Sequence, residues 1–113
     1  MSLERVLKIL ENLGLPRTDA EMYVYLAKKG PKGEQDLFRT FKMTDTQLRS
    51  SLSSLQNRGL VTATVESSVL FSAVEFGKAL ELLIKINIEH IQTAKEEREF
   101  LKIWRPIGKR DLT

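Results

Sequence analysis

The hydrophobic pattern of this chain changes its period at Gly59, and this change limits the folds that the chain can adopt. Before Gly59, three leucines follow the i, i+4, i+7 spacing of one helix face: Leu48, Leu52 and Leu55. After Gly59, residues 60–65 and 69–74 are two β-rich runs with a period of about two. The sequence therefore predicts a helix that leads directly into a β-hairpin.

Both ends of this helix carry sequence signals, and its outer face is polar. Thr44 and Gln47 have the spacing of a capping box, in which each side chain bonds the free backbone amide of the other residue. Gly59 supplies a residue that ends a helix with a positive φ. The outward side chains are polar: Thr46, Gln47, Arg49, Ser50 and Ser53. Such a face suits the reading of base edges in a DNA major groove, and it is equally typical of an ordinary solvated helix.

Three shorter helices are predicted before this one. Residues 3–13 carry an apolar stripe, and Gly14 ends the first helix. Thr18 with Glu21 repeats the capping-box spacing, so we expect the second helix to open there. Residues 34–42 form the third helix. Its predicted buried edge consists of three apolar residues: Leu37, Phe38 and Phe41.

Two successive helices joined by a tight turn and followed by a hairpin are the layout of a winged helix-turn-helix. We predict a mainly α fold with a small β-hairpin, in which this domain covers residues 1–74. A long C-terminal dimerisation helix follows over residues 75–105. Pro106 and Gly108 are expected to end regular structure, which leaves residues 106–113 as a flexible tail.

The first half of the long helix, residues 79–91, is apolar on more than one side, so packing on one domain cannot cover it all. We interpret the surplus as a two-fold contact between two copies, in which Asn87 would fix the register. The predicted dimerisation residues follow a heptad-like spacing: Leu80, Leu83, Ile84, Asn87 and Ile91. A second apolar cluster, from Phe100 to Trp104, either closes the far end of the dimer or folds back on the N-terminal helix.

The composition excludes several chemistries. The 113 residues include no cysteine and one histidine, which removes disulfides, thiolate zinc sites and nearly every histidine-based triad. No catalytic or metal-ligand spacing is present, so we expect no enzyme, no metal and no cofactor. The N-terminus lacks an apolar signal core, and no apolar run is long enough to span a bilayer. We therefore expect a cytoplasmic protein without a membrane partner.

Two runs of core and turn residues resemble a known family. They are the run L-G-L…A-x-M-Y-V-x-L…G-P, which begins at Leu13, and the run L-x-x-L-x-x-R-G-L-V, which ends at Val61. Together they resemble the winged-helix domain of archaeal TrmB-type regulators and, more distantly, of MarR-type regulators. The resemblance covers about Leu3 to Leu83. It implies that the helix over residues 44–58 enters the major groove and that the hairpin tip follows the DNA backbone.

The leading interpretation is a homodimeric, sequence-specific transcriptional regulator that binds double-stranded DNA. Gln47 suits adenine and Arg49 suits guanine by bidentate pairing. The predicted base contacts are Thr46, Gln47, Arg49, Ser50 and Ser53. The predicted phosphate contacts are Lys32, Thr44, Ser67 and Ser68. The large effector-binding domain of sugar-responsive TrmB proteins is not in this sequence, so we expect no sugar ligand, and no residue points to another effector.

A second interpretation is a winged-helix module that binds another protein in transcription or chromatin without tight DNA binding. The hairpin turn holds Ser67 and Ser68 and no arginine or lysine, and Asp45 stands at the start of the polar helix. Residues 1–74 hold 10 basic and 8 acidic side chains, a net charge of only +2, within a whole-chain charge of +3. Domains that bind DNA strongly are usually more basic.

Overall fold

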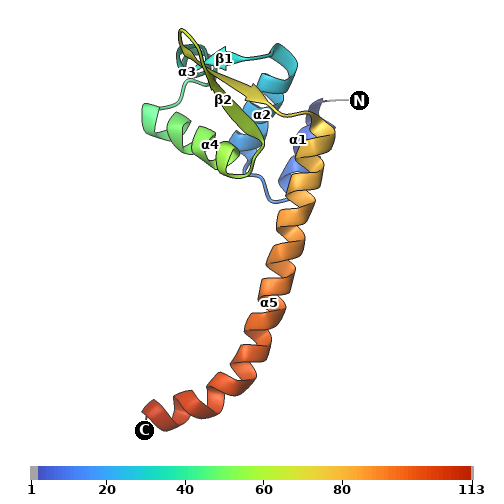
Figure 1. Ribbon diagram of the computed structural model, residues 1–113, viewed down its shortest axis with the longest axis vertical. Helices are drawn as coiled ribbons and strands as arrows, with labels where there is room; N and C mark the ends of the chain where they lie inside the picture. Colours follow the sequence, from blue (N-terminus) through green and yellow to red (C-terminus); the bar gives the residue numbers. More distant parts are fainter. Residues whose placement is uncertain (1–2, 113) are drawn as a thin grey trace.

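Five helices and three short strands make up the part of the chain that the computed structural model describes, residues 3–112, with side chains described for residues 3–103 (Figure 1). The elements in chain order are α1 (Leu3–Asn12), α2 (Arg17–Lys29), β1 (Lys32–Gly33), α3 (Glu34–Phe41), α4 (Asp45–Asn57), β2 (Val61–Val65), β3 (Val69–Ala73) and α5 (Phe76–Leu112). This order confirms the predicted helix-turn-helix of α3 and α4, the hairpin of β2 and β3, and the long last helix.

The three strands form one antiparallel sheet in the order β1-β3-β2. In the hairpin, Val61 pairs with Ala73 and Val65 pairs with Val69. β1 was not predicted, because a strand of two residues has no period that a sequence pattern can reveal. It exists because the link from α2 to α3 lies beside β3, where Lys32 pairs with Phe71.

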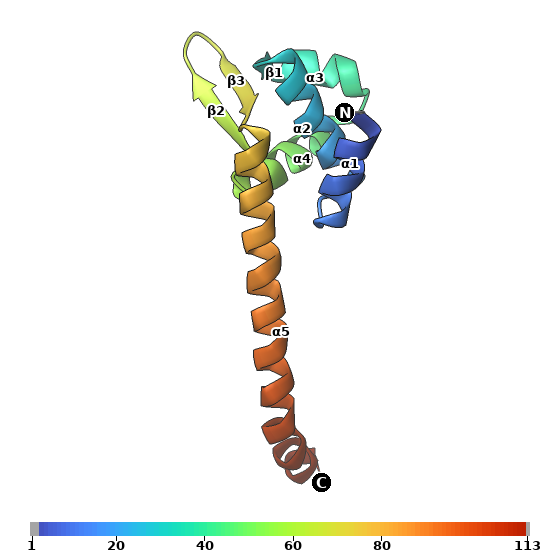
Figure 2. The same cartoon turned by 90° about the vertical axis from the view of Figure 1, so that its right-hand side faces the viewer.

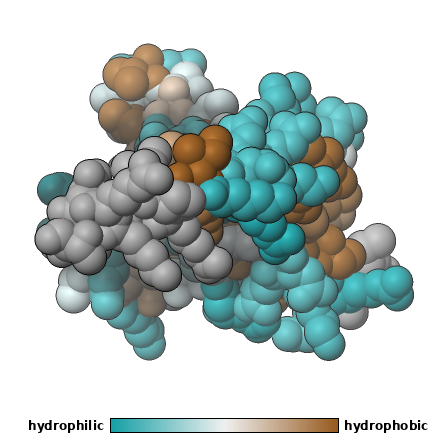
Figure 3. All heavy atoms as spheres, turned by 90° about the horizontal axis from the view of Figure 1, so that it is seen from below, coloured by the Kyte–Doolittle hydropathy of each residue, from teal (hydrophilic) through white to brown (hydrophobic). Residues whose placement is uncertain are grey.

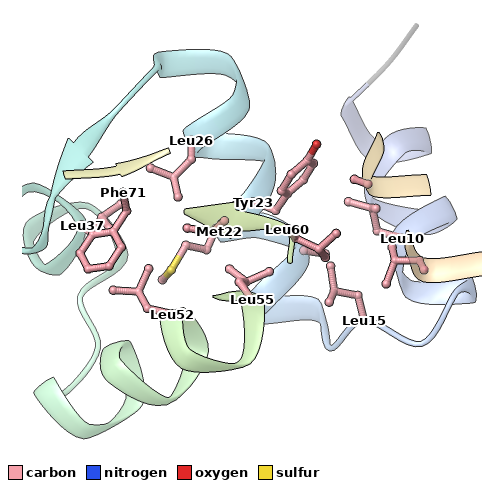
Figure 4. Packing of buried hydrophobic residues seen from close by; sticks show 14 of the residues in the cluster. Leu10, Leu15, Met22, Tyr23, Leu26, Leu37, Leu52, Leu55, Leu60 and Phe71 are labelled. Carbon is pink, nitrogen blue, oxygen red and sulfur yellow. The ribbon is translucent and has the colours of Figure 1, made fainter. Parts of the chain in front are cut away.

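The core lies between α2, α4 and the sheet. Leu48 and Leu55 of α4 are completely buried and Leu52 is 4% exposed, as the helical spacing predicted. Figure 4 shows Leu52 and Leu55 pointing from α4 toward Met22 of α2, which is also completely buried. Burial of the leucines holds α4 by its inner face, and the polar face opposite them is therefore left at the surface.

The predicted start of α2 was wrong. The helix begins at Arg17 with Pro16 as its N-cap residue, and no side chain caps it. Pro16 has φ −57°, and its carbonyl accepts a hydrogen bond from the N–H of Ala20 at 2.9 Å. The helix therefore begins two residues earlier than a Thr18 cap would place it, and Glu21 accepts a hydrogen bond from the Arg17 side chain instead of closing a capping box with Thr18.

The prediction for α3 needs one correction. Leu37 is completely buried, and Phe41 is half-buried against the Tyr25 ring, with ring centroids 5.5 Å apart in an edge-to-face arrangement. Phe38, however, is 41% exposed and does not belong to the buried edge. A helix of only two turns has a narrow inner face, and one residue beyond Leu37 the chain has turned about 100° away from it.

α5 leaves the domain as a long projection, and the molecule measures 61 × 32 × 25 Å (Figures 1 and 2). The structure continues the helix to Leu112, past the end that Pro106 was expected to impose. A proline removes one backbone donor, and a helix accommodates this loss by bending; α5 changes direction toward its C-terminal end in Figure 1. Among the described residues, no helix is both long and apolar enough to cross a membrane.

The distal apolar cluster lies on this projection and not on α1. Phe100, Leu101 and Ile103 are 59%, 49% and 63% exposed. Both views of the ribbon place this part of α5 far from the domain (Figures 1 and 2). The alternative in which the cluster folds back on the N-terminal helix is therefore wrong for these three residues. The side chain of Trp104 lies outside the described ones.

Tyr23 offers a test of this packing. Its hydroxyl donates a hydrogen bond to the Val74 carbonyl at 2.6 Å, and burial, with a smaller contribution from Glu75, raises the pKa of Tyr23 from 10 to about 12. Because the raised pKa favours the neutral phenol, this group stabilises the fold fully below pH 10 and the stabilisation is lost as the pH rises toward 12. Tyr23→Phe is expected to cost about 1 kcal/mol near neutral pH.

The measurement is urea unfolding of the wild type and Tyr23→Phe at several pH values. The difference in free energy of unfolding should shrink between pH 10 and pH 12. Tyr25→Phe is the control, because the Tyr25 hydroxyl only accepts a 3.4 Å hydrogen bond from Thr40 at the surface. A difference that stays constant with pH contradicts the assignment.

Candidate nucleic-acid interface

α4 begins with the capping box that the sequence predicted. The Thr44 hydroxyl accepts a hydrogen bond from the backbone N–H of Gln47 at 3.1 Å, and Gln47 Oε1 accepts one from the backbone N–H of Thr44 at 3.0 Å. The cap thus engages the side-chain carbonyl of Gln47, which bidentate pairing with adenine also needs. The amide nitrogen of Gln47 stays free to donate, and its Oε1 keeps one lone pair beside the bond from Thr44, so the adenine pairing remains a prediction.

The five side chains predicted to contact bases lie together on the outer face of α4. All of them belong to exposed residues: Thr46, Gln47, Arg49, Ser50 and Ser53. The inner face carries the completely buried Leu48 and Leu55. The helix is therefore held by its apolar side and presents hydroxyl, amide and guanidinium groups on the other, which are groups that hydrogen-bond to base edges and phosphates.

Arg49 is held by a residue of the preceding helix. Its Nε donates to Oε1 of Glu34 at 3.2 Å, and the two side chains are 71% and 43% exposed. Glu34 is the first residue of α3, so this ion pair connects the start of α3 to the outer face of α4. No sequence pattern indicates this pair, because the two residues are 15 positions apart and on different helices.

A buried hydrogen bond fixes α4 against α2. Ser51 Oγ donates to Oδ1 of Asp19 at 2.5 Å, and these residues are 5% and 6% exposed. A signal for Ser51 was present, because it lies three residues after Leu48 and four before Leu55, on the leucine face. Above this pair is an open pocket of about 450 Å3. Six of its seven lining residues are of polar types: Thr18, Asp19, Thr46, Gln47, Ser50 and Ser51, with Met43 as the seventh.

Basic side chains around α4 do not form an uninterrupted stripe. Arg39 donates to Asp36 at 2.6 Å, and Arg49 is paired with Glu34. Lys42 is exposed at the C-cap of α3, where the backbone is left-handed with φ 49°. Lys32, predicted to contact phosphate, is half-buried in β1. Two of these cations, Arg39 and Arg49, are therefore paired with carboxylates of α3.

The hairpin of β2 and β3, which we call the wing, exposes polar and apolar side chains and has no basic residue. Ser67 and Ser68 are exposed at its turn, as predicted, where the Glu66 N–H donates to the Ser68 carbonyl at 3.2 Å. Val65 and Val69 flank the turn and are 73% and 43% exposed. No basic residue occurs in positions 59–77. Any phosphate contact from this wing must therefore come from hydroxyls or backbone amides.

The structure divides the predicted dimerisation residues into two groups. Leu83 is completely buried in the core of its own domain, and Asn87 Nδ2 donates to the Leu13 carbonyl at 2.8 Å. Their assignment to a contact between copies is corrected, because the first turns of α5 pack on the link between α1 and α2. Leu80 is half-buried, whereas Ile84 and Ile91 are 47% and 57% exposed.

An isoleucine stripe remains uncovered on α5. It consists of Ile84, Ile88 and Ile91, of which Ile88 is 50% exposed. The spacing i, i+4, i+7 places the three on one helix face, a signal that was present in the sequence although Ile88 was not selected. Seen from below, hydrophobic patches also break the mostly hydrophilic surface (Figure 3). We refer to these three residues as the isoleucine stripe.

A helix-turn-helix whose second helix leads into a β-hairpin defines the winged helix-turn-helix class, and the described residues have this architecture. The family model described as "Sugar-specific transcriptional regulator TrmB" matches residues 10–77. The chain belongs to the TrmB family. The resemblance found in the sequence is thereby confirmed.

Solved structures share the fold at low sequence identity. TrmBL2, described as an archaeal chromatin protein with a novel mode of DNA binding, is similar with a TM-score of 0.69 and 20% identity over 96% of this chain and 45% of TrmBL2. This chain thus spans less than half the length of TrmBL2. The ST1889 protein from the archaeon Sulfolobus tokodaii gives a TM-score of 0.64 and 22% identity, over 83% of this chain and 99% of its own.

Transcriptional regulator Tm0710 from Thermotoga maritima gives a TM-score of 0.59 and 17% identity, over 96% of this chain and 88% of its own. At these identities the likeness shows the fold and not a shared ligand. Comparison with curated protein sequences finds no match.

Proposed function

We propose that this protein is a transcriptional regulator that binds double-stranded DNA as a homodimer, with α4 in the major groove. The observation that carries the proposal is the capped α4, whose inner face is buried leucine and whose outer face is polar and exposed. The membership of the TrmB family supports it. So does the fold shared with TrmBL2, a protein described as binding DNA.

The isoleucine stripe supports the proposed dimer. Three exposed isoleucines at one helix face have no partner within the described residues, and burying each against a second copy contributes about 1 to 2 kcal/mol. A two-fold contact along α5 places two copies of α4 on the same assembly. Successive major grooves on one side of DNA are about 34 Å apart, so this is the spacing that the dimer would have to provide.

Phosphate contacts complete the proposed interface. Lys32 precedes the N-terminus of α3, where free backbone amides favour an anion. Ser67 and Ser68 would contact the backbone from the wing through their hydroxyls, and Thr44 would do so from the start of α4. With a net charge of only +2 over residues 1–74, binding should fall with salt less steeply than for strongly basic domains.

Gln47→Glu tests the interface without disturbing the fold. Glutamate at this capping-box position can accept the same hydrogen bond from the Thr44 N–H, and its charge is favourable at a helix N-terminus. On the proposed DNA face, however, the carboxylate would approach phosphates. We expect unchanged thermal stability and DNA binding that is about tenfold or more weaker, measured by fluorescence anisotropy on a mixed-sequence duplex at low salt.

Gln92→Glu is the matched control, because Gln92 is an exposed residue of α5 away from α4. It makes the same chemical change and should leave binding unchanged. An equal effect of both substitutions would mean that only net charge matters and would contradict the placement of α4. Absence of any wild-type binding, even at low salt, would refute the DNA proposal as a whole.

The second candidate function is a module that binds another protein. The observation that favours it is the wing, where Val65 and Val69 are exposed and no cation is present. Exposed apolar side chains at a loop tip are more typical of protein contacts than of DNA backbone contacts. Failure of the wild type to bind DNA at low salt, together with a folded dimer, would favour this candidate.

A further inference from the structure

We propose that Glu34 is a positioning residue for Arg49 and thereby sets the preference of α4 for one guanine. The inference rests on the proposed DNA-binding function and adds a determinant of specificity to it. It starts from the ion pair in which Arg49 Nε donates to Glu34 Oε1 at 3.2 Å. Both Nη groups of Arg49 remain without an acceptor among the described residues.

The geometry of the guanidinium group explains why it matters that Nε is bonded to Glu34 while both Nη groups are free within the part of the chain that the structure describes. The group is planar, and its five N–H donors point in fixed directions within that plane. Glu34 occupies the donor nearest the aliphatic stem. The far edge, formed by Nη1 and Nη2, stays available for the bidentate contact with O6 and N7 of guanine. A carboxylate on Nε thus restricts the side chain and leaves the reading edge free.

Glu34 is well placed for this role because it belongs to another helix. It is the first residue of α3, and the backbone of Gly33 before it pairs with Leu70 of the sheet. The backbone that carries its carboxylate is therefore held independently of α4. The pair is exposed, so it contributes little to stability, and removing it should leave the fold intact.

The proposal predicts two effects of opposite sign. A carboxylate near the DNA face repels phosphates whatever the sequence, so Glu34→Ala should strengthen binding to non-cognate DNA severalfold. The same substitution releases Arg49, which can then contact phosphates or other bases. The preference for guanine should therefore fall about tenfold. A purely structural role for Glu34 would weaken cognate and non-cognate binding together.

Asp36 provides the matched control. It is a residue of the same helix, its carboxylate accepts a hydrogen bond from Arg39 at 2.6 Å, and it forms no hydrogen bond or ion pair with Arg49. Asp36→Ala removes the same charge from the same helix. It should strengthen non-cognate binding to a similar extent while leaving the base preference unchanged.

The experiment is selection of bound duplexes from a randomised library with the wild-type protein, followed by anisotropy titrations. The selected site and a site with its Arg49-dependent guanine replaced by adenine are compared for wild type, Glu34→Ala, Glu34→Gln, Asp36→Ala and Arg49→Ala. We expect Arg49→Ala to abolish the preference and Glu34→Ala to reduce it. Glu34→Gln keeps an acceptor without the charge and should have an intermediate preference.

Three results would overturn the inference. Glu34→Ala with the wild-type base preference would overturn it while the DNA proposal stands. Equal loss of preference in Asp36→Ala would show that net charge and not the pair is responsible. No enrichment and no binding by the wild type would refute the proposed function, and the inference with it. Circular dichroism confirms that each variant is folded before its titration is interpreted.

Discussion

Replacing Ile88 by lysine is expected to separate the dimer into monomers and to weaken binding to a duplex with two half-sites by about 10²- to 10⁴-fold. Ile88 is the central residue of the isoleucine stripe and is 50% exposed on a single chain. Within one chain, lysine at this position meets solvent and costs little. Between two copies it would bury two ammonium groups against each other, which is strongly unfavourable.

The loss of affinity follows from linkage of the two half-sites. When one α4 is bound, the second α4 of a dimer binds at a high effective concentration, and a monomer lacks this advantage. Sedimentation velocity should show a dimer for the wild type and a monomer for Ile88→Lys. Anisotropy on duplexes with one and two half-sites should then show that only the wild type benefits from the second half-site.

His90→Lys is the matched control for this experiment. His90 is an exposed residue two positions further along α5, which places it about 200° around the helix from Ile88. It should remain dimeric. Dissociation of both variants would mean that charge on α5 is responsible, and a dimeric Ile88→Lys would contradict the isoleucine stripe as the contact.

Ser51→Ala is expected to lower the free energy of unfolding by about 1 to 3 kcal/mol, although it removes a single oxygen atom. The Ser51 hydroxyl is the donor to Asp19 Oδ1 at 2.5 Å between α4 and α2. Without it, a carboxylate that is 6% exposed loses a hydrogen bond in a place where water has limited access. For a chain of this size, each kcal/mol corresponds to a fall in Tm of roughly 4 to 8 °C.

Ser50→Ala is the neighbouring control, because Ser50 is exposed on the outer face of α4. It should change stability by no more than about 0.5 kcal/mol. Urea unfolding followed by circular dichroism measures both variants. Equal stabilities of the two would show that the Ser51–Asp19 bond does not hold α4 in place. If DNA is bound as proposed, Ser50→Ala should weaken binding while leaving the fold unchanged.

Ile88→Lys tests an apolar contact between copies, and Ser51→Ala tests a buried hydrogen bond within one chain. The sequence indicated the first contact better than the second. The isoleucines of α5 follow a helical period, so the existence of an uncovered apolar face could be predicted. The sequence could not show which of these residues stay exposed in a single chain, because Leu83 and Asn87 satisfy the helical pattern as well as Ile84 does. Only the packing of α5 on the link after α1 separated them, through burial of Leu83 and the bond from Asn87 to Leu13.

The sequence alone determined the features that depend on neighbours along the chain. The capping box of Thr44 and Gln47 joins residues three apart, and the change of period at Gly59 marks the end of α4, where the backbone has φ +79°. Core leucines, the hairpin and the polar outer face of α4 follow from the same short-range patterns. The winged helix-turn-helix fold could therefore be predicted from these patterns, and the TrmB family from the resemblance of its core and turn residues.

The tertiary structure decided which polar side chains meet across helices. Ser51 with Asp19 and Arg49 with Glu34 are pairs separated by 32 and 15 positions. β1 likewise formed only because its two residues lie beside β3. A local pattern records which face a residue occupies, but it carries no information on what lies opposite that face. The choice of partner depends on how the helices pack, and this is why the bond that anchors α4 and the carboxylate that holds Arg49 became visible only in three dimensions.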